Sequence, residues 1–230
     1  MIHIAENSRI FTDKINLKVY QYIHPTISLA DTSIFPPVIS LNHKILARLS
    51  GPVPNRYAFA GCTILLYIIA GSISYRDTTG FKSTLQRGDL LRFDDQYGSY
   101  ENCLLNSGDE TEAELIEIIV PTAIKADKHY HHICSSSTRM NALKTISTAL
   151  PEPNTNAEAV LAYEGRFEDN ILVVHNRAHP DGKIVLINLR GTMIANETLL
   201  NRYDVLIIDD GAALTLNMLL KTTFLLFEFK

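Results

Sequence analysis

A histidine-rich segment holds the densest group of metal-ligand side chains in the sequence. Residues 128–134 read Lys-His-Tyr-His-His-Ile-Cys. Residues i and i+2 of an extended strand point to the same side, so His129 and His131 could approach one ion with Cys134 nearby. An opportunistic metal site that includes His132 is one interpretation. The interpretation we favour is a connecting segment without a metal role.

The three cysteines, Cys62, Cys103 and Cys134, form no C-x-x-C pair. A sparse, odd set of cysteines is typical of free thiols in a reducing compartment, and we expect a cytoplasmic protein. Cys62 precedes an apolar run and is expected in the core. Cys103 is a candidate for an oxidation-sensitive thiol, and Cys134 is expected near the surface.

Familiar catalytic motifs are absent. The sequence has no G-x-S-x-G elbow, no phosphate-binding P-loop and no G-x-G-x-x-G fingerprint. Two acidic pairs, Asp94-Asp95 and Asp209-Asp210, occupy equivalent turn-like positions in the two halves of the chain. Adjacent residues of an extended chain point to opposite faces, so neither pair is expected to act as an acid–base couple.

Composition narrows the class of protein further. The chain has 230 residues, of which 46% are hydrophobic and 20% charged, and its formal net charge is −4. This balance supports a sizeable core and argues against a nucleic-acid partner. The first 14 residues carry charges where a signal peptide is apolar, and the apolar run at 63–71 is about half the roughly 20 residues of a membrane helix. We therefore expect no membrane association.

The elements that must position these side chains are mostly short strands. Apolar runs and alternating patterns are separated by turn residues such as Thr79-Gly80, Gly88-Asp89 and Pro180-Asp181-Gly182. One segment, residues 139–150, is compatible with a helix. Strands are expected at residues 15–22, in two pieces of 38–49, and at 63–70, 72–75, 81–86, 90–93, 113–120, 171–175, 183–189, 204–208, 212–218 and 222–229.

An internal repeat indicates a duplicated barrel. Residues 67–71 (YIIAG) precede a strand, a turn and Arg-Gly-Asp-Leu-Leu, while residues 185–191 (VLINLRG) precede a strand, a turn and Tyr-Asp-Val-Leu. The predicted fold is all-β with two jelly-roll barrels. We expect a first barrel over residues 1–125, a connector over 126–155 and a second barrel over 156–230.

One stretch of the first half resembles the pirin-like bicupins, which include pirins and bacterial flavonol (quercetin) dioxygenases. The resemblance rests on Tyr67-Ile68-Ile69-Ala70-Gly71, on the Arg76-Asp77-Thr78 turn with Gly80, and on Gly88-Asp89. Residues 38–42 (VISLN) resemble a further strand of that family. The resemblance implies two cupin barrels in one chain.

The resemblance also implies a metal site, and the residues found there do not suit it. Metal-binding members hold iron or a similar ion with three histidines and a glutamate; the matching positions here are Tyr57, Phe59, Glu101 and Cys103. One carboxylate and one thiol do not make a tight site, so we expect no metal and no cofactor. The second barrel of this fold usually lacks a metal, and here it offers only His179 at the comparable place.

Three functions remain open at this point. The first is a metal-free pirin-like protein that binds a small molecule or a protein partner, with Tyr57 and Phe59 as apolar walls of the pocket and Glu101 and Cys103 as its polar groups. The second is a metal-dependent quercetin-type dioxygenase, which the missing histidines disfavour. The third is a cysteine-based sensor of oxidation. We expect no catalytic residue, and fold likeness cannot choose among these functions.

Overall fold

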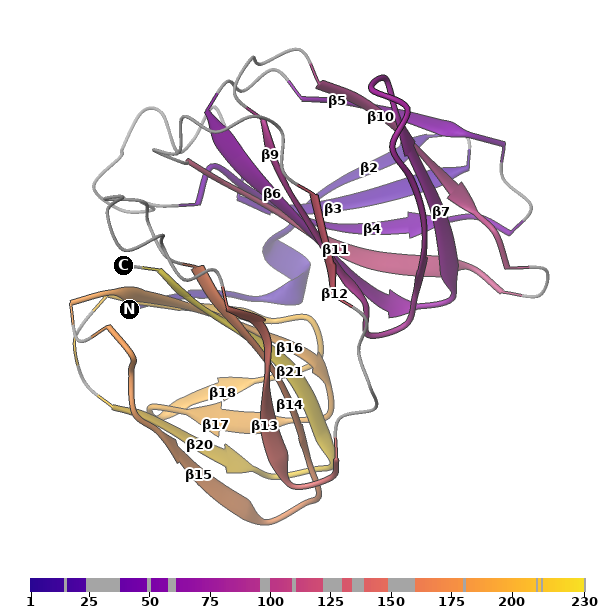
Figure 1. The fold of residues 1–230 in the computed structure, drawn as a ribbon. Helices are drawn as coiled ribbons and strands as arrows, with labels where there is room; N and C mark the ends of the chain where they lie inside the picture. Colours follow the sequence, from indigo (N-terminus) through magenta and orange to yellow (C-terminus); the bar gives the residue numbers. More distant parts are fainter. Residues whose placement is uncertain are drawn as a thin grey trace. The chain divides into compact units, whose positions relative to one another are not determined.

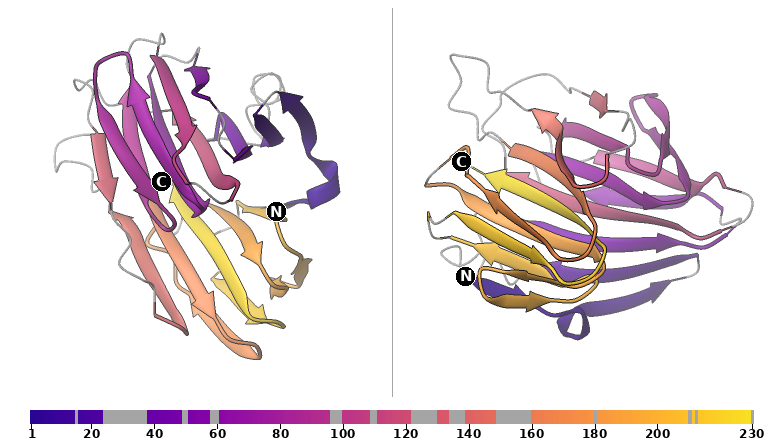
Figure 2. Two further views of the ribbon diagram at one scale, coloured as in Figure 1. Left: turned by 90° about the vertical axis from the view of Figure 1, so that its right-hand side faces the viewer. Right: turned by 90° about the horizontal axis from the view of Figure 1, so that it is seen from below.

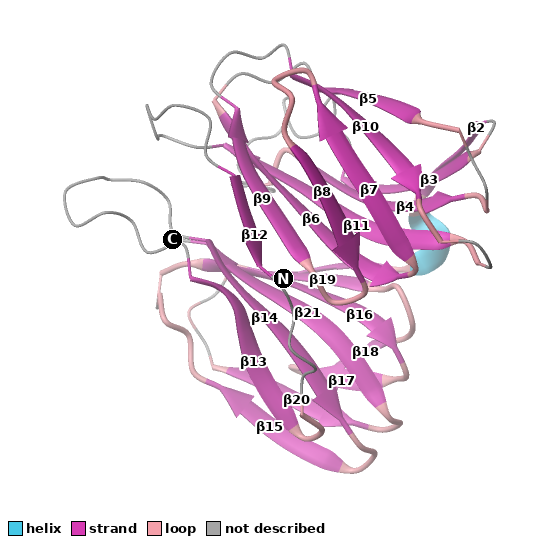
Figure 3. Ribbon diagram, turned by 45° about the vertical axis from the view of Figure 1, so that its right-hand side comes forward, coloured by secondary structure: helices cyan, strands magenta, loops and turns pink. Residues whose placement is uncertain are grey.

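The computed structural model describes residues 1–14, 16–23, 38–48, 51–57, 61–95, 100–108, 111–121, 130–133, 139–148, 160–179, 181–209, 211 and 213–229. These residues form antiparallel strands and one short 3-10 helix (Figure 3). The all-β prediction is therefore confirmed. Within the same ranges, no helix has the length and apolarity needed to cross a membrane.

The chain divides into two compact units, which we call the N-terminal unit (Ile10–Ser136) and the C-terminal unit (Met1–Arg9 with Ser137–Lys230). The N-terminal unit has a seven-stranded sheet in the order β12-β9-β6-β11-β4-β3-β2 and a four-stranded sheet in the order β5-β10-β7-β8 (Figure 1). Its strands are β2 (Ile10–Lys14), β3 (Leu17–Ile23), β4 (Ser40–Leu46), β5 (Val53–Tyr57), β6 (Cys62–Ala70), β7 (Ser72–Asp77), β8 (Lys82–Gln86), β9 (Leu90–Asp95), β10 (Tyr100–Asn106), β11 (Ala113–Pro121) and β12 (Tyr130–Ile133).

Side chains from both sheets build the core of the N-terminal unit. Every second residue of β6 enters it, as strand alternation requires. The four-stranded sheet covers these residues with its own alternate positions, and the apolar interior of the barrel lies between the two sheets. The core includes Cys62, Ile64, Leu66 and Ile68 from β6, and Ile73, Tyr75, Leu85 and Leu104 from the four-stranded sheet.

The C-terminal unit repeats this plan with a six-stranded sheet, β1-β19-β16-β21-β14-β13, and a four-stranded sheet, β15-β20-β17-β18. Figure 2 allows its strands from β14 onward, coloured orange to yellow, to be followed from two further sides, while β1 is indigo. Its elements are β1 (Ile2–Ile4), η1 (Glu6–Ser8), β13 (Ala142–Thr148), β14 (Val160–Phe167), β15 (Ile171–His175), β16 (Lys183–Arg190), β17 (Met193–Ala195), β18 (Thr198–Leu200), β19 (Val205–Ile208), β20 (Leu214–Met218) and β21 (Thr222–Phe229).

The repeat seen in the sequence recurs in the backbone hydrogen bonds. In each unit a glycine at positive φ, Gly71 or Gly191, ends one long strand. The turn before β9 or β19 then bonds back to that long strand. These bonds run from Gly88 N–H to Ile68 O and from Ile68 N–H to Asp89 O in one unit, and from Tyr203 N–H to Asn188 O and from Asn188 N–H to Asp204 O in the other.

The structure differs from the sequence-based expectations in several places, and it includes strands that were not expected, among them β5, β10 and β14. Residues 1–9 join the C-terminal unit, because β1 pairs with β19. The helix expected near residues 139–150 is wrong: Ala142–Thr148 forms β13, which pairs with β14 and contains the β-branched residues that strands favour. Within residues 38–48 there is one strand, β4, where two pieces were expected.

Candidate functional site

The positions that the resemblance assigns to metal ligands lie on or near β5 and β10. These two strands pair antiparallel, with Tyr57 opposite Tyr100 and Glu101 opposite Arg56. The side chains of Tyr57 and Glu101, and the whole of Phe59, lie outside the described part of the structure. The prediction that these three residues line one cavity is therefore not tested.

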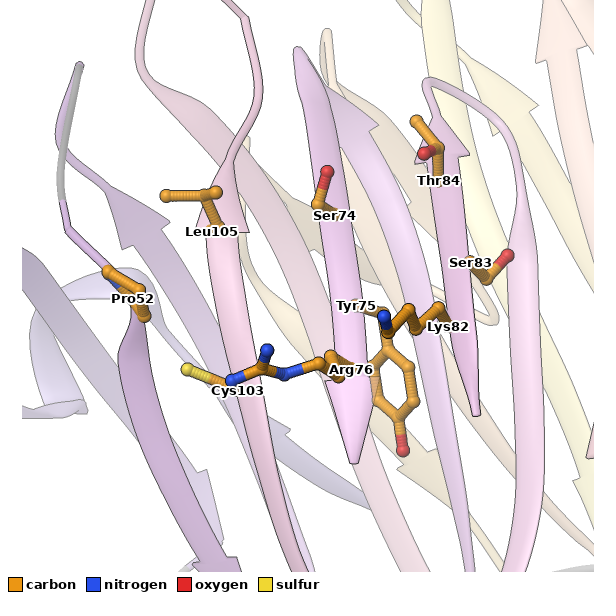
Figure 4. A pocket seen from close by; sticks show the side chains of 9 residues that line it. All are labelled: Pro52, Ser74, Tyr75, Arg76, Lys82, Ser83, Thr84, Cys103 and Leu105. Carbon is orange, nitrogen blue, oxygen red and sulfur yellow. The ribbon is translucent and has the colours of Figure 1, made fainter. Parts of the chain in front are cut away.

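The register of β10 places Cys103 on the outer side of the sheet. Asn102, Leu104 and Asn106 are buried, with Leu104 in the barrel core, whereas Cys103 is partly exposed. Figure 4 shows Cys103 on the side of the sheet that carries Ser74 and Arg76. Cys103 therefore does not point into the interior, where the resemblance placed it: the inward set of β10 is displaced by one residue from the matched positions, and a one-residue shift reverses the face.

Asn102 therefore occupies the inward position where the resemblance led us to expect a ligand. Its side chain is 3% exposed, and among the described residues neither its amide nitrogen nor its amide oxygen has a hydrogen-bond partner. A buried unpaired polar group costs about 1–3 kcal/mol. A polar group buried in this way needs an explanation, and a bound ligand, an ordered water molecule or an ion would supply the hydrogen-bond partner.

A second polar group inside the same barrel is already satisfied. The Glu117 carboxylate accepts hydrogen bonds from Lys44 Nζ at 2.7 Å and from Asn42 Nδ2 at 2.9 Å. All three side chains are buried. Paired in this way, Glu117 is not available as a metal ligand.

The donor groups in the described part of the N-terminal barrel do not fit the metal that the resemblance implies. No group of three histidine, cysteine, aspartate or glutamate side chains in the described ranges lies close enough together to hold an ion. An inward amide at Asn102 and an outward thiol at Cys103 replace the nitrogen and carboxylate donors that such ions prefer. We accordingly assign no reaction step to a metal in this barrel.

The structure describes only part of the histidine-rich segment, together with the whole of Cys62. His131 and His132 lie in β12, which pairs with β9, while His129 and Cys134 fall outside the described residues. The side chains of the two β12 histidines are also outside the description, so the metal interpretation stays open. Cys62 is fully buried in the core, as predicted.

A pocket of about 510 Å³ opens on the outer face of the four-stranded sheet of the N-terminal unit. It crosses β10, β7 and β8 and reaches the segment before β5 (Figure 4). Its volume is within the range of small-molecule sites, roughly 300–1,000 Å³. Its lining mixes cationic, hydroxyl, thiol and apolar side chains: Pro52, Ser74, Tyr75, Arg76, Lys82, Ser83, Thr84, Cys103 and Leu105.

Strand pairing sets the polar side chains of this pocket in two rows. Cys103 lies opposite Arg76, which lies opposite Lys82. In the next row Ser74 lies between two neighbours, Leu105 on β10 and Thr84 on β8. In the sequence, Arg76 stood out only as part of the Arg76-Asp77-Thr78 turn. The signal that could have found the pair is the Thr79-Gly80 turn, which makes β7 and β8 a hairpin and sets positions 76 and 82 face to face.

The C-terminal unit holds a separate polar cluster that the sequence did not reveal. The ring of His175 donates a hydrogen bond to Glu228 Oε1 at 2.5 Å, and Ala178 N–H donates to Oε2 at 2.8 Å. The Tyr163 ring packs edge-on against the His175 ring, with 5.2 Å between the two ring centroids. His175 and Glu228 are 53 residues apart in the chain. His179, expected in a turn, is partly exposed beside this cluster.

Comparison with known proteins identifies the fold. No family model and no curated protein matches the sequence. The structure is similar to that of the Escherichia coli pirin YhhW, solved in complex with nickel(II), with a TM-score of 0.81 and 14% identity over 99% of this chain and 97% of that one. It is also similar to quercetin 2,3-dioxygenase from Acinetobacter baumannii, with a TM-score of 0.72 and 15% identity over 99% and 85%. These likenesses confirm the predicted pirin-like bicupin fold.

Proposed function

We propose that this protein is a small-molecule-binding bicupin without dioxygenase activity. The observation that carries the proposal is Asn102, a buried amide with two unpaired atoms at the inward position of β10. The carboxamide offers one acceptor and two donor hydrogens. It suits an uncharged polar ligand, such as an alcohol, a ketone or an amide, better than a metal ion.

The competing function is a quercetin-type dioxygenase, suggested by the name of one structural neighbour. Such an enzyme needs a metal held by several fixed ligands with a position left open for substrate or oxygen. Two features of the barrel weigh against it. The Glu117 carboxylate already accepts hydrogen bonds from Lys44 and Asn42, and the Cys103 side chain points away from the barrel interior.

The test of the dioxygenase alternative combines metal analysis with a flavonol-loss assay. The purified protein is supplied with iron, manganese, nickel or copper, dialysed, and assayed with quercetin. We expect well under one equivalent of metal per chain and no flavonol loss above the rate without protein. About one equivalent of metal, lost in Glu101→Ala, together with flavonol turnover, would restore the enzyme hypothesis.

The binding proposal has its own test, which uses the two inward asparagines of β10. Fragments bearing hydroxyl, ketone or amide groups are screened against the wild type by ligand-observed NMR. We expect Asn102→Leu to lose the fragments found and to keep the stability of the ligand-free protein, because it removes unpaired polar atoms.

The matched control is Asn106→Leu. Asn106 bonds to the carbonyls of Ala47 and Thr111 and to Gly108 N–H, so its loss should cost about 2 kcal/mol or more. If Asn102→Leu is as destabilising as Asn106→Leu, or binds the fragments unchanged, the assignment of Asn102 is wrong.

A further inference from the structure

Two cationic residues occupy paired positions on the outer side of the four-stranded sheet of the N-terminal unit. Arg76 on β7 lies directly opposite Lys82 on β8, and both side chains are exposed. Neither forms an ion pair with any carboxylate in the part of the chain that the structure describes. Like charges directly opposite on neighbouring strands destabilise a sheet. An anion bound between them would remove that repulsion.

The same two side chains line the outer pocket, together with groups that suit an anion. Ser74 and Thr84, which lie on the same face of the sheet as Arg76 and Lys82, bring hydroxyl donors to it (Figure 4). The described lining includes no carboxylate. Figure 4 also shows Arg76 extending from β7 toward Cys103 on β10, so the guanidinium lies across the pocket.

We propose that this pocket binds a small organic molecule through a doubly charged oxyanion head, of which a phosphate monoester is the best match. Such a group carries about −1.5 to −2 charge at pH 7 and three acceptor oxygens. Two cations and neighbouring hydroxyls complement that charge and geometry. The site is on the opposite side of the sheet from Asn102, so it is independent of the interior binding proposed above.

The pocket also has room and surface for the organic part of the ligand. Pro52 and Leu105 form an apolar side next to the cations. The volume of about 510 Å³ matches a compact molecule. A net charge of −4 disfavours a nucleic-acid backbone as the occupant. The chemistry therefore points to a small aromatic or aliphatic phosphate.

Calorimetric titration at low salt tests the proposal with defined probes. The probes are phenyl phosphate, inorganic phosphate, benzoate and phenol. We expect phenyl phosphate to bind most tightly, inorganic phosphate and benzoate more weakly, and phenol not to bind. Affinity for phenyl phosphate should fall as the pH drops from 7.5 to 5.5, because the second phosphate pKa is about 6. Benzoate binding as tight as phenyl phosphate would assign the site to carboxylates instead.

The variants Arg76→Gln and Lys82→Gln locate the site. Each should weaken phenyl phosphate binding roughly fivefold or more, and each should fold, because both side chains are exposed. The control is Arg87→Gln, which removes an exposed arginine outside the pocket lining and should leave binding unchanged. No binding by the wild type, or equal affinity in all variants, would overturn the proposal.

Cys103 gives an independent readout of where the probe binds. Its thiol lines the pocket, whereas Cys62 is fully buried. In a Cys134→Ser background, saturating phenyl phosphate should slow alkylation of Cys103 by iodoacetamide several-fold, and phenol should not. Unchanged alkylation at saturation would place the probe elsewhere and contradict the assignment.

Discussion

Glu228 is a buried carboxylate whose hydrogen bonds keep it charged. Burial by itself would raise its pKa, but the hydrogen bonds from the His175 ring and from Ala178 N–H outweigh burial and hold the pKa below its ordinary value of 4.5. Burial, and then the nearby Glu228 carboxylate, raise the pKa of Tyr163. The hydrogen bonds from His175 and Ala178 to the charged Glu228 thereby connect the end of β15 and the segment after it to β21.

The lowered pKa makes the contribution of Glu228 to stability depend on pH. Because its folded pKa lies below its unfolded pKa, the contribution is present above about pH 4.5 and is lost as the pH falls through the folded value. We expect Glu228→Gln to lower the free energy of unfolding by about 1–3 kcal/mol at pH 7, and by progressively less below pH 4.5. Urea denaturation of the wild type and the variant at pH 7, 5, 4 and 3 measures the loss of unfolding free energy and how it changes with pH. The control is Glu168→Gln, which removes an exposed ion pair with Lys221 and should have little effect on stability. If Glu228→Gln lowers stability equally at every pH, this account of Glu228 is wrong.

The strand–glycine–strand unit is the element that both halves of the chain share. Gly191 has φ +81°, and a Cβ at this position would lie 2.3 Å from the carbonyl oxygen of Lys221. Gly71 is equivalent: its φ is +75°, and a Cβ there would lie 2.9 Å from Ala113 Cα. The glycine thus lets the chain leave one sheet for the other where the start of β11 or β21 passes closely.

Alanine substitutions separate the two requirements on this glycine. Gly80 also has a positive φ, +91°, but a Cβ there would have no neighbour within 4 Å. We expect Gly80→Ala to cost about 1–2 kcal/mol for backbone conformation alone, and Gly191→Ala to cost about 1–3 kcal/mol more because of the clash. Thermal and urea denaturation of the two variants give the difference. Equal losses would mean that the close approach to Lys221 does not matter.

At the scale of the whole molecule, the first nine residues belong to the unit formed by the last part of the chain. β1 pairs with β19 from Ile2 to Ile4, and the Asp204 carboxylate accepts hydrogen bonds from Glu6 N–H and from the His3 ring. Without β1, β19 would become the edge of its sheet, with unpaired backbone groups.

Deletion of residues 1–9 tests this assignment. We expect amide hydrogen exchange to speed up at least tenfold in β19, because its edge groups become exposed to water. Exchange in β11 of the N-terminal unit serves as the internal control and should stay unchanged. If β19 keeps its protection after the deletion, β1 does not close the sheet in solution.

The sequence by itself determined the class of fold and its duplication. Alternation, turn residues and the recurrence of residues 67–71 in 185–191 depend on local geometry, which neighbouring residues fix. The same local signals placed Cys62 in the core, before an apolar strand. The lack of histidine at positions 57, 59, 101 and 103, which the resemblance assigns to metal ligands, was also visible, because it depends only on the order of residues in the sequence.

Only the tertiary structure decided the faces and the partners. Whether Asn102 or Cys103 points inward depends on the register of β10 against β5 and β7, and a single residue of shift exchanges the two. β13 became a strand because β14 offered it a partner. The contact of His175 with Glu228 joins residues far apart in the chain. Whether a carboxylate lies near Arg76 or Lys82 likewise depends on the fold, and none of the described carboxylates pairs with either. Long-range pairing sets these features, and no local pattern encodes it.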